Sequence, residues 1–410
     1  LSFMAQVWFA VIYCLAPMAL LSSFNNVANY HFSISEKDVE SIFAQLTILL
    51  FYLSLLFGMK LGSHFKGFLK LSRKNVNVTK LCYILIVIGV IGLYIFIKSY
   101  SGLQYVLSNL SSIRSGHADI KSYLGAFAFS FFKFVNLSFF IYLSKFLLSN
   151  NKKSETSIYF LLLNLIFCLI GLYLSAGREH AIAFLISIIV IYIAIKRKTP
   201  IKLVLISIVI VAFYIIFGKT LLFAIYEENF NVSDFFDERF FPMLQNSYEI
   251  IILEFTHQYM SLVNFFNYDK DYRFFYDYIN WLFVPLKFIG VNYGDSVSYF
   301  NTYIITGRWE SIIPPGPVAF GYMSLGALGV VIHGTLIGYI YRMIDKVFNN
   351  NNSSLNLNPI LVGFYGWLVP NFTYLISNSD LTLFFQNRIP VILFFLFLVF
   401  FCKAKYVKRG

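Results

Sequence analysis

Charged side chains are scarce in this sequence, and their scarcity argues against a soluble fold. Asp, Glu, Lys and Arg make up 13% of the 410 residues, whereas 58% of the residues are hydrophobic. The mean hydropathy is +0.70. Soluble domains usually carry about a quarter of charged residues. The composition therefore predicts an all-α, polytopic integral membrane protein.

Cysteine is also rare, and the familiar metal-binding and catalytic motifs are missing. The four cysteines, Cys14, Cys82, Cys168 and Cys402, each fall in an apolar segment, so we expect no disulfide framework. There is no His-Glu-x-x-His motif, no phosphate-cradling glycine loop and no Gly-x-Ser-x-Gly elbow. An inverted internal repeat is missing too, which counts against a carrier. We expect neither a metal ion nor another cofactor.

Apolar segments long enough to cross a membrane recur along the chain. A crossing helix needs about 20 predominantly apolar residues, and ten such segments are present. They cover residues 4–22, 41–59, 81–98, 124–147, 158–174, 180–195, 203–217, 317–340, 359–376 and 389–402. The first segment has neither a basic n-region nor a clear cleavage site, so we expect it to be retained.

These segments divide the chain into three parts. Residues 1–217 are expected to form seven transmembrane helices with short loops, and residues 218–316 a large outer loop. Residues 317–410 are expected to form three transmembrane helices and a basic tail. The large loop is the most polar part of the chain.

Basic residues are distributed asymmetrically between the connections. Lys and Arg cluster in residues 60–80, 145–153, 196–202 and 403–409. With ten crossings these stretches all lie on one side, which the positive-inside rule assigns to the cytoplasm together with both termini. Of the 20 acidic residues, only Glu155 and Asp345 fall on that side. The net charge of +12 thus reflects membrane orientation, and we expect no nucleic-acid partner.

Two stretches of the large loop resemble helices that do not cross the membrane. Ser247–Phe266 is apolar on one face, and residues 278–291 are aromatic and contain Pro285. Both are short and carry aromatic residues suited to the membrane interface, so we expect them to lie on the surface or to re-enter the bundle. Together they would form a cap over an aqueous cavity.

Two arginines are the main candidates for binding a diphosphate. Arg178 lies in a very short outer turn, and Arg308 precedes Pro314 and Pro315, which fix the start of the next helix. A guanidinium is planar and permanently charged, so it can clamp phosphate groups bidentately, which lysine cannot do. The alternatives are an interfacial arginine that pairs with Glu179 or with lipid headgroups, and a helix start that is merely rigid.

Further polar residues of the outer segments are weaker candidates for substrate binding. Arg114 and His117 follow the third apolar segment, and Arg239 lies in the large loop. Asp295, after Tyr293-Gly294, could bind sugar hydroxyl groups. The alternative for each of them is an ordinary solvated side chain.

Three histidine and lysine positions carry possible chemistry inside helices. His257 follows Glu254 by three residues, so the two share a helix face on which a carboxylate could orient an imidazole for proton transfer. The alternative is a packing or surface histidine. Lys133 and His333 fall inside apolar segments, where ionisable groups suggest function. The alternatives are snorkelling for Lys133 and hydrogen bonding within the bundle for His333.

Short motifs distributed over nearly the whole chain resemble one family of membrane enzymes. These motifs are Gly177-Arg178, Leu-Ser-Ser-Ile-Arg-Ser-Gly at 110–116, Tyr293-Gly294, Ile-Ile-Pro-Pro-Gly at 312–316 and Tyr-Met-Ser-Leu-Gly-Ala-Leu-Gly at 322–329. They resemble the bacterial O-antigen polymerases, the Wzy-type oligosaccharide repeat-unit polymerases.

The resemblance implies a GT-C-like helical fold and a metal-independent, inverting glycosyl transfer. A hydroxyl group of one undecaprenyl-diphosphate-linked repeat unit would attack the anomeric carbon of the growing chain, and undecaprenyl diphosphate would leave. The reaction would take place at the periplasmic face of the inner membrane. Membrane lipid and a chain-length regulator are further partners that the family suggests.

The resemblance also assigns roles to individual residues. Arg178 and Arg308 would stabilise the charge that develops on the leaving diphosphate, and Arg114 matches the family less closely. Many relatives carry a glutamate shortly after Pro-Pro-Gly, but this chain reads Val-Ala-Phe-Gly-Tyr at 318–322. The proton acceptor is therefore expected among Glu310, His257 and Glu254.

Three other functions remain as alternatives. An O-antigen ligase would transfer the finished glycan to lipid A-core, but its usual His-Asn pair is missing from the large loop. A non-enzymatic flippase of lipid-linked glycan would need polar groups throughout its spans, which here are nearly free of charge. An assembly partner without chemistry of its own is the third.

Overall fold

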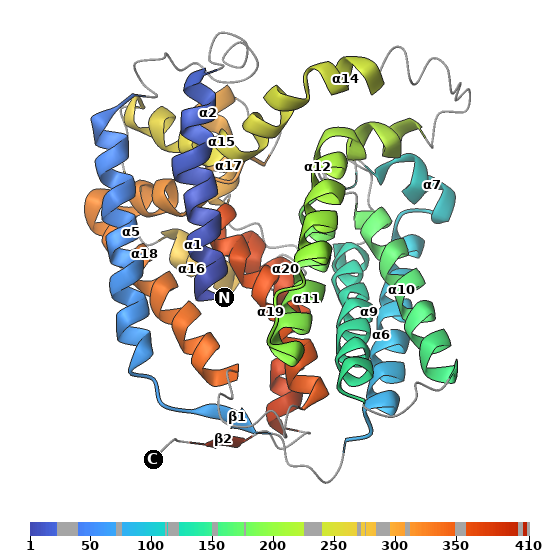
Figure 1. Cartoon of the computed structure of the whole chain (residues 1–410). Coiled ribbons are helices and arrows are strands. Elements are labelled where there is room, and N and C mark those ends of the chain that lie inside the picture. Colours follow the sequence, from blue (N-terminus) through green and yellow to red (C-terminus); the bar gives the residue numbers. More distant parts are fainter. Residues whose placement is uncertain are drawn as a thin grey trace. The chain divides into compact units, whose positions relative to one another are not determined.

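The protein is predominantly helical over the part of the chain that its computed structural model describes (Figure 1). This part comprises residues 1–22, 40–70, 76–110, 113, 123–149, 155–175, 178–224, 240–268, 272–274, 276–283, 296–307, 312–348, 358–400 and 405–407. Two three-residue strands, β1 (Phe68–Lys70) and β2 (Lys405–Val407), pair antiparallel. The helical class is confirmed, and the strand pair is an addition that the sequence did not predict.

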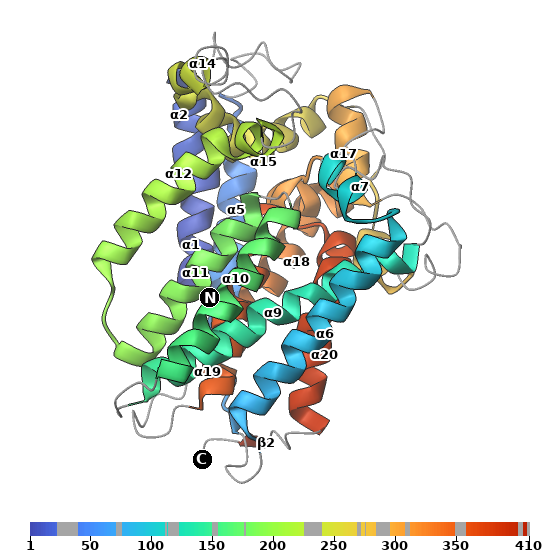
Figure 2. The same ribbon diagram turned by 90° about the vertical axis from the view of Figure 1, so that its right-hand side faces the viewer.

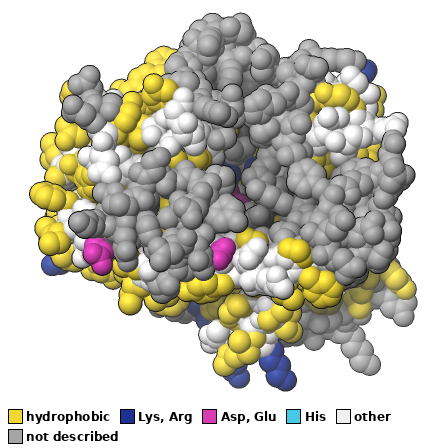
Figure 3. Space-filling model, turned by 90° about the horizontal axis from the view of Figure 1, so that it is seen from above, with side chains coloured by type: hydrophobic (Ala, Val, Ile, Leu, Met, Phe, Trp, Pro, Cys, Tyr) yellow, Lys and Arg dark blue, Asp and Glu magenta, His cyan; other side chains and the backbone are white. Residues whose placement is uncertain are grey.

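Eight helices of the described chain are long and apolar enough to cross a membrane. They are Ser2–Leu21, Ile42–Ser63, Val78–Ser99, Phe127–Leu148, Ile158–Ser175, Glu179–Lys196, Gly316–Phe348 and Pro359–Ser377. Two shorter apolar helices, Ile201–Phe217 and Asn387–Phe400, coincide with the other two expected segments. Among the residues coloured in Figure 3, hydrophobic side chains greatly outnumber charged ones. The chain is therefore a multi-pass membrane protein, whereas its orientation stays a prediction.

The helices form two compact units, each assembled from segments that are distant in sequence. The first unit contains Leu1–Gly67, Asn246–Val347 and Phe372–Asn387. The second contains Phe68–Gln245, Phe348–Asn371 and Arg388–Gly410. Helices α19 (Pro359–Ser377) and α20 (Leu381–Phe400) therefore contribute to both units.

The first unit combines the start of the chain with part of the large loop. Its first helices are α1 (Ser2–Ala10), the π-helical turn η1 (Val11–Leu15), α2 (Ala16–Ser22) and α5 (Ile42–Ser63). They are joined by α15 (Ser247–Phe266), α16 (Tyr276–Ile279), α17 (Val297–Thr306) and most of α18 (Gly316–Phe348). The bounds of α15 are those that the sequence predicted, and α15 packs against η1, α2 and α17.

The second expected loop helix is described only in part, and α17 is new. Helix α16 and the 3₁₀ residues after it cover 276–283, so the remainder of the predicted helix at 278–291 lies outside the described residues. Nothing in the sequence pattern indicated α17. Its Ser298, Asn301 and Thr302 side chains are all buried.

Helix α18 is bent sharply and is not one continuous span. Leu325 and Gly326 depart from helical geometry, with φ values of −151° and 61°. The break separates residues 316–324 from residues 327–348. A Cβ atom on Gly329 would lie 2.1 Å from the carbonyl oxygen of Gly321, so the backbones on the two sides of the break are in contact. The expected single span at 317–340 is corrected to a short helix that folds back on a longer one.

Helices α5 and α18 approach each other closely through small residues. A Cβ atom on Gly58 would lie 2.1 Å from the carbonyl oxygen of Thr335, and one on Gly338 would lie 2.1 Å from that of Leu55. Each helix carries two glycines four residues apart, Gly58 and Gly62 on α5 and Gly334 and Gly338 on α18. Small residues at this spacing allow backbones of membrane helices to touch, and dispersion forces then stabilise the pair. Gly58 and Gly338 thus fix the central pair of helices in the first unit.

The second unit is arranged around one long helix, α9 (Tyr123–Leu148). Its other helices are α6 (Val78–Ser99), α7 (Leu103–Ser108), α10 (Glu155–Ser175), α11 (Arg178–Lys196), α12 (Ile201–Ala224) and α14 (Phe241–Gln245). Helix α9 packs against α6, α10 and α11 (Figure 2). The hydroxyl group of Ser138 in α9 donates a 2.8 Å hydrogen bond to Oδ1 of Asn164 in α10. Such polar contacts between helices are worth about 1 kcal/mol in a membrane.

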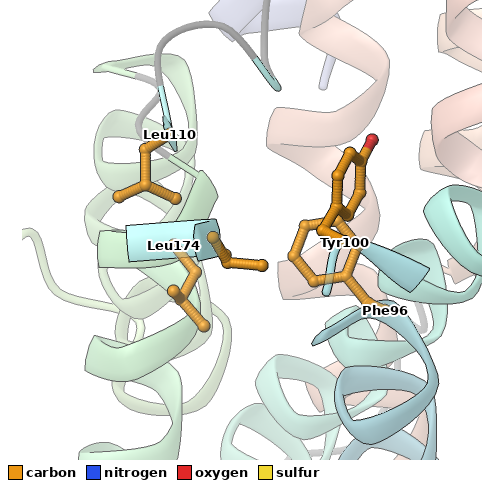
Figure 4. Close-up of a cluster of buried hydrophobic side chains, with 5 residues drawn as sticks. Phe96, Tyr100, Leu110 and Leu174 are labelled. Carbon is orange, nitrogen blue, oxygen red and sulfur yellow. The ribbon is translucent and has the colours of Figure 1, made fainter. Parts of the chain in front are cut away.

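An apolar cluster joins α6, α7 and α10 at one end of the second unit (Figure 4). Phe96 and Tyr100 face Leu110 and Leu174, and all four side chains are buried. The rings of Phe96 and Tyr100 meet edge to face with centroids 5.1 Å apart. The cluster fixes the C-terminal end of α10.

Candidate functional site

Most of the predicted site residues lie outside the part of the chain that the structure describes. These are Arg114, His117, Arg239, Tyr293, Asp295, Arg308 and Glu310. Arg178 is described through its backbone as the first residue of α11, but not through its side chain. Glu254 and His257 are both described and lie in α15. Their proposed roles stay predictions.

His257 is held by a backbone carbonyl group. Its Nδ1 atom lies 2.9 Å from the carbonyl oxygen of Glu254 and donates to it, which leaves Nε2 unprotonated. Nε2 is buried and has no hydrogen-bond partner among the described residues. Burial lowers the pKa of His257, although the nearby Glu254 charge and the Nδ1 hydrogen bond oppose this effect. The sequence expected the Glu254 carboxylate to orient the ring, whereas the hydrogen bond is made to its backbone.

His333 is a buried histidine inside α18. Its Nε2 atom lies 3.2 Å from the hydroxyl oxygen of Ser379. That hydroxyl group donates its proton to the carbonyl oxygen of Leu375, so Nε2 of His333 must be the donor to Ser379. The ring packs against Phe320, with centroids 4.5 Å apart. This geometry favours the alternative reading of a hydrogen-bonded histidine within the bundle.

Two buried carboxylates anchor the loop helices, and the sequence analysis singled out neither. Asp277 accepts two hydrogen bonds from Arg273, at 2.6 Å and 2.8 Å, and is 2% exposed. Burial raises the pKa of Asp277, and the Arg273 guanidinium opposes that rise. Asp380 accepts from the backbone nitrogens of Ser298 at 3.2 Å and Leu383 at 2.9 Å. It therefore caps α20 and holds the start of α17.

A pocket within the second unit is the best candidate for a binding site. It lies between α9, α10, α11 and α19, and contains about 540 Å³ of empty space, counting the solvent at its mouth. Four phenylalanines and Trp367 line it. Its polar lining consists of Lys133, Asn136, Ser175, His180, Ser187 and Asn371. The pocket thus combines an aromatic wall with hydrogen-bonding and charged groups.

The pocket extends along the helices that form it. Its α9 residues run from Phe129 to Phe140 at helical spacing, which corresponds to about 16 Å along the axis. On α11 they run from His180 to Ser187, about 10 Å into a segment that can cross a membrane. One end of the pocket therefore lies beside the first turn of α11, where Arg178 begins the helix.

Charged side chains from two helices meet beside this first turn. Glu179 forms an ion pair with Arg388 of α20, with Nη2 and Oε1 2.8 Å apart. Lys133 lies close enough to interact electrostatically with both partners. The N-terminus of α11 adds the positive end of its dipole.

The structure changes the reading of three residues here. The carboxylate of Glu179 pairs with Arg388, whereas the side chain of Arg178 lies outside the described part of the chain, so its pairing with Glu179 stays a prediction. Lys133 lines the pocket, which favours the functional reading over snorkelling. Arg388 was not singled out from the sequence. An arginine at the start of an apolar segment was the signal that could have identified it as a candidate.

No protein-family model matches the chain, and neither a curated protein nor a solved structure matches it. The class that the fold defines is a multi-pass, helical membrane protein. Within that class, the cationic pocket of the second unit is the feature that bears on function.

Proposed function

We propose that this protein polymerises oligosaccharide repeat units linked to undecaprenyl diphosphate. In this reaction the hydroxyl group of one repeat unit displaces undecaprenyl diphosphate from the anomeric carbon of the growing chain. The transfer is inverting and needs no metal ion. It takes place at the outer face of a bacterial inner membrane and produces O-antigen or a similar surface polysaccharide.

The observation that carries the proposal is the cationic pocket beside the first turn of α11. Lys133 and His180 line the pocket, Arg388 pairs with Glu179 of the first turn, and Arg178 begins the helix. Ionisable groups are costly inside a membrane-spanning bundle and usually mark a functional site, so these groups favour an anionic ligand. A lipid diphosphate supplies one charge on each phosphorus and leaves as an anion, which these groups would stabilise.

The short motifs that resemble the Wzy-type polymerases give the second support. Among them is Gly177-Arg178, which leads into the same first turn of α11. The aromatic wall of the pocket suits a sugar ring or an isoprenoid, and amide groups from α9 and α19 suit hydroxyl groups. The charged groups, the aromatic lining and the Gly177-Arg178 motif thus all favour a lipid-linked, phosphorylated sugar as the substrate.

The test is complementation of a deletion in a bacterial host that makes the repeat unit. Without the protein, core lipid should carry a single repeat unit, and wild-type protein should restore the polymer ladder on a gel. Arg178→Ala should abolish the ladder, and Arg178→Lys should recover little of it because a lysine cannot bind bidentately. A lipid profile with no repeat unit at all in the deletion strain would contradict polymerisation and indicate a ligase or a flippase.

A matched control lies at the other end of the same helix. Arg197 follows α11, is exposed, and is expected on the cytoplasmic side. Arg197→Ala removes the same charge and should leave the ladder unchanged. Equal loss of the ladder in Arg178→Ala and Arg197→Ala, at equal protein levels, would argue against a specific role for Arg178.

The proton acceptor can be tested in the same assay. Glu310→Gln and His257→Ala separate the two main candidates. The unprotonated Nε2 atom of His257 supports that residue. Full ladders in both variants would exclude both residues as the base.

A further inference from the structure

Residues 272–274 and 276–283, here called the inverted segment, bury their polar side chains and expose their apolar ones. Asp277 is buried and accepts two hydrogen bonds from Arg273, and Asn280 is buried as well. The outward side chains are large, hydrophobic or aromatic, and between 42% and 62% exposed: Tyr272, Phe274, Tyr276, Ile279, Leu282 and Phe283. In water this arrangement would be unfavourable on both faces. Beside hydrocarbon it is the favourable one.

The inverted segment lies at the depth of a membrane-spanning helix. Tyr278 packs against the ring of His333 in α18, with centroids 5.6 Å apart, and against Phe320, with centroids 5.1 Å apart. Residues 327–348 of α18 are about 33 Å long, close to the roughly 30 Å of the hydrocarbon core of a bilayer. His333 is about 10 Å along this helix from the bend at Gly326. Tyr278 therefore lies beside the span and not beyond its end.

The inverted segment also covers the bend of α18. The backbone nitrogen of Arg273 donates a 2.8 Å hydrogen bond to the carbonyl oxygen of Met323, just before the bend. Carbonyl groups at the end of a helix lack intrahelical partners, so this bond satisfies one of them. A Cβ atom on Gly326 would lie 2.9 Å from the hydroxyl oxygen of Tyr272, so this side chain lies on the bend itself. Non-helical backbone is tolerated at membrane depth only where protein or water covers it.

We propose that the inverted segment is embedded in the bilayer, where its polar face covers the bend of α18 and its apolar face contacts lipid acyl chains. The sequence left open whether this part of the large loop lies on the membrane surface or re-enters the bundle, and the proposal decides for re-entry. It does not depend on the proposed function, because it concerns only how the first unit meets the membrane.

Lipid is the occupant that fits the apolar face best. The two charged side chains of the described segment, Arg273 and Asp277, pair with each other and leave the outward face without charge. A water-facing surface or the rim of a protein interface would carry polar and charged groups. Tyr272 and Tyr276 come first in the segment, and aliphatic side chains follow them from Ile279 onward. This order matches a chain that passes from the membrane interface, which tyrosine favours, into hydrocarbon.

The experiment is spin-label accessibility of the full chain in nanodiscs, in a variant whose four native cysteines are replaced by alanine. A label at Ile279→Cys should collide more often with oxygen, which partitions into lipid, than with a water-soluble nickel chelate. Its depth should exceed that of a label at Tyr272→Cys by about 10 Å. Phe57→Cys, at an exposed position of the spanning helix α5, is the lipid reference, and exposed Arg197→Cys is the water reference.

Two results of this measurement would overturn the proposal. Collisions of the Ile279→Cys label mainly with the nickel chelate would place the apolar face in water. Low collision rates with both reagents would show that protein covers this face, whether from the same chain or from a second copy.

A second measurement needs neither labels nor the removal of cysteines. Ile279→Lys should lower the midpoint of unfolding in mixed micelles, because a lysine in contact with acyl chains is costly. Ile279→Leu keeps the side chain apolar at the same volume and should leave the midpoint unchanged. An unchanged or higher midpoint for Ile279→Lys is the result expected of a residue in water, and it would contradict the contact with lipid.

The cover over the bend is tested by hydrogen exchange of the backbone amides in residues 325–329. Tyr272→Ala removes the ring that lies on Gly326 and should speed this exchange. Tyr276→Ala removes an exposed ring from the same segment and should leave the exchange as in the wild type. Equal exchange in the wild type and in Tyr272→Ala would refute the covering role.

Discussion

Replacement of Gly316 by alanine should destabilise the first unit strongly, because this glycine meets two demands at once. Its φ is +74°, a backbone conformation that residues with a side chain rarely adopt. A Cβ atom would also lie 2.6 Å from the hydroxyl oxygen of Tyr13 and 2.7 Å from Cβ of Gln258. The backbone nitrogen of Gly316 donates to the carbonyl oxygen of Asn378, so the residue cannot move away freely.

The two contributions can be estimated separately. A positive φ costs a residue with a side chain about 1–2 kcal/mol. Forcing an extra carbon atom into a packed site costs about 1–3 kcal/mol more. Gly307 isolates the first contribution, because its φ is +70° and no atom of the described residues lies within 4 Å of an added Cβ. Gly307→Ala should therefore cost only the backbone contribution, and Gly316→Ala about 2 kcal/mol more.

The assay is reversible unfolding in mixed micelles, in which added dodecyl sulfate unfolds the protein and tryptophan fluorescence reports on it. Trp8 and Trp281 lie in the first unit. Adding Gln258→Ala to Gly316→Ala should relieve part of the crowding, so the loss should be smaller than the sum of the single losses. Equal losses for Gly316→Ala and Gly307→Ala would refute the argument from crowding.

Three further predictions concern other contacts of the first unit. Gly58→Leu should lower the unfolding midpoint by separating α5 from α18, whereas the same leucine at exposed Phe57 should not. Asp277→Asn should cost about 3 kcal/mol in the same assay by leaving the Arg273 charge without its carboxylate, and Arg273→Leu/Asp277→Leu should cost less. Burial lowers the pKa of His257 from its usual 6.5, so its contribution to stability is present above pH 6.5 and lost as the pH falls. Between pH 7 and pH 5 the midpoint of His257→Gln should therefore fall less than that of the wild type, and equal slopes would contradict this.

The sequence predicted the helices well wherever hydrophobicity alone determines them. All ten apolar segments are helical over nearly all of their described residues, and Ser247–Phe266 has the predicted bounds because its apolar face repeats at helical spacing. The bend at Leu325 and Gly326 was not predicted, since both residues continue an apolar run. Helix α17 was also missed, because its polar residues are buried through partners far away in sequence, such as Asp380 for Ser298.

In the candidate site, too, contacts between residues far apart in sequence could not be predicted. The turn at Arg178 could be singled out from a charge in a very short connection. The pairing of Glu179 with Arg388 could not be predicted, because nothing local to either residue specifies a partner 209 positions away. Lys133 was noticed as an ionisable group in a span. Its place in the pocket follows from how α9 packs against α10 and α11, which a single sequence does not determine.

The glycine contact between α5 and α18 also has a consequence for biosynthesis. Gly58 and Gly338 are about 280 residues apart, and ribosomes add roughly 5–20 residues per second. The newly inserted α5 must therefore wait roughly 15–55 s in the bilayer before its partner is made. During that time its small-residue face is open to the wrong helices. The contact between α5 and α18 can therefore form only late in synthesis, after most of the other helices have been made.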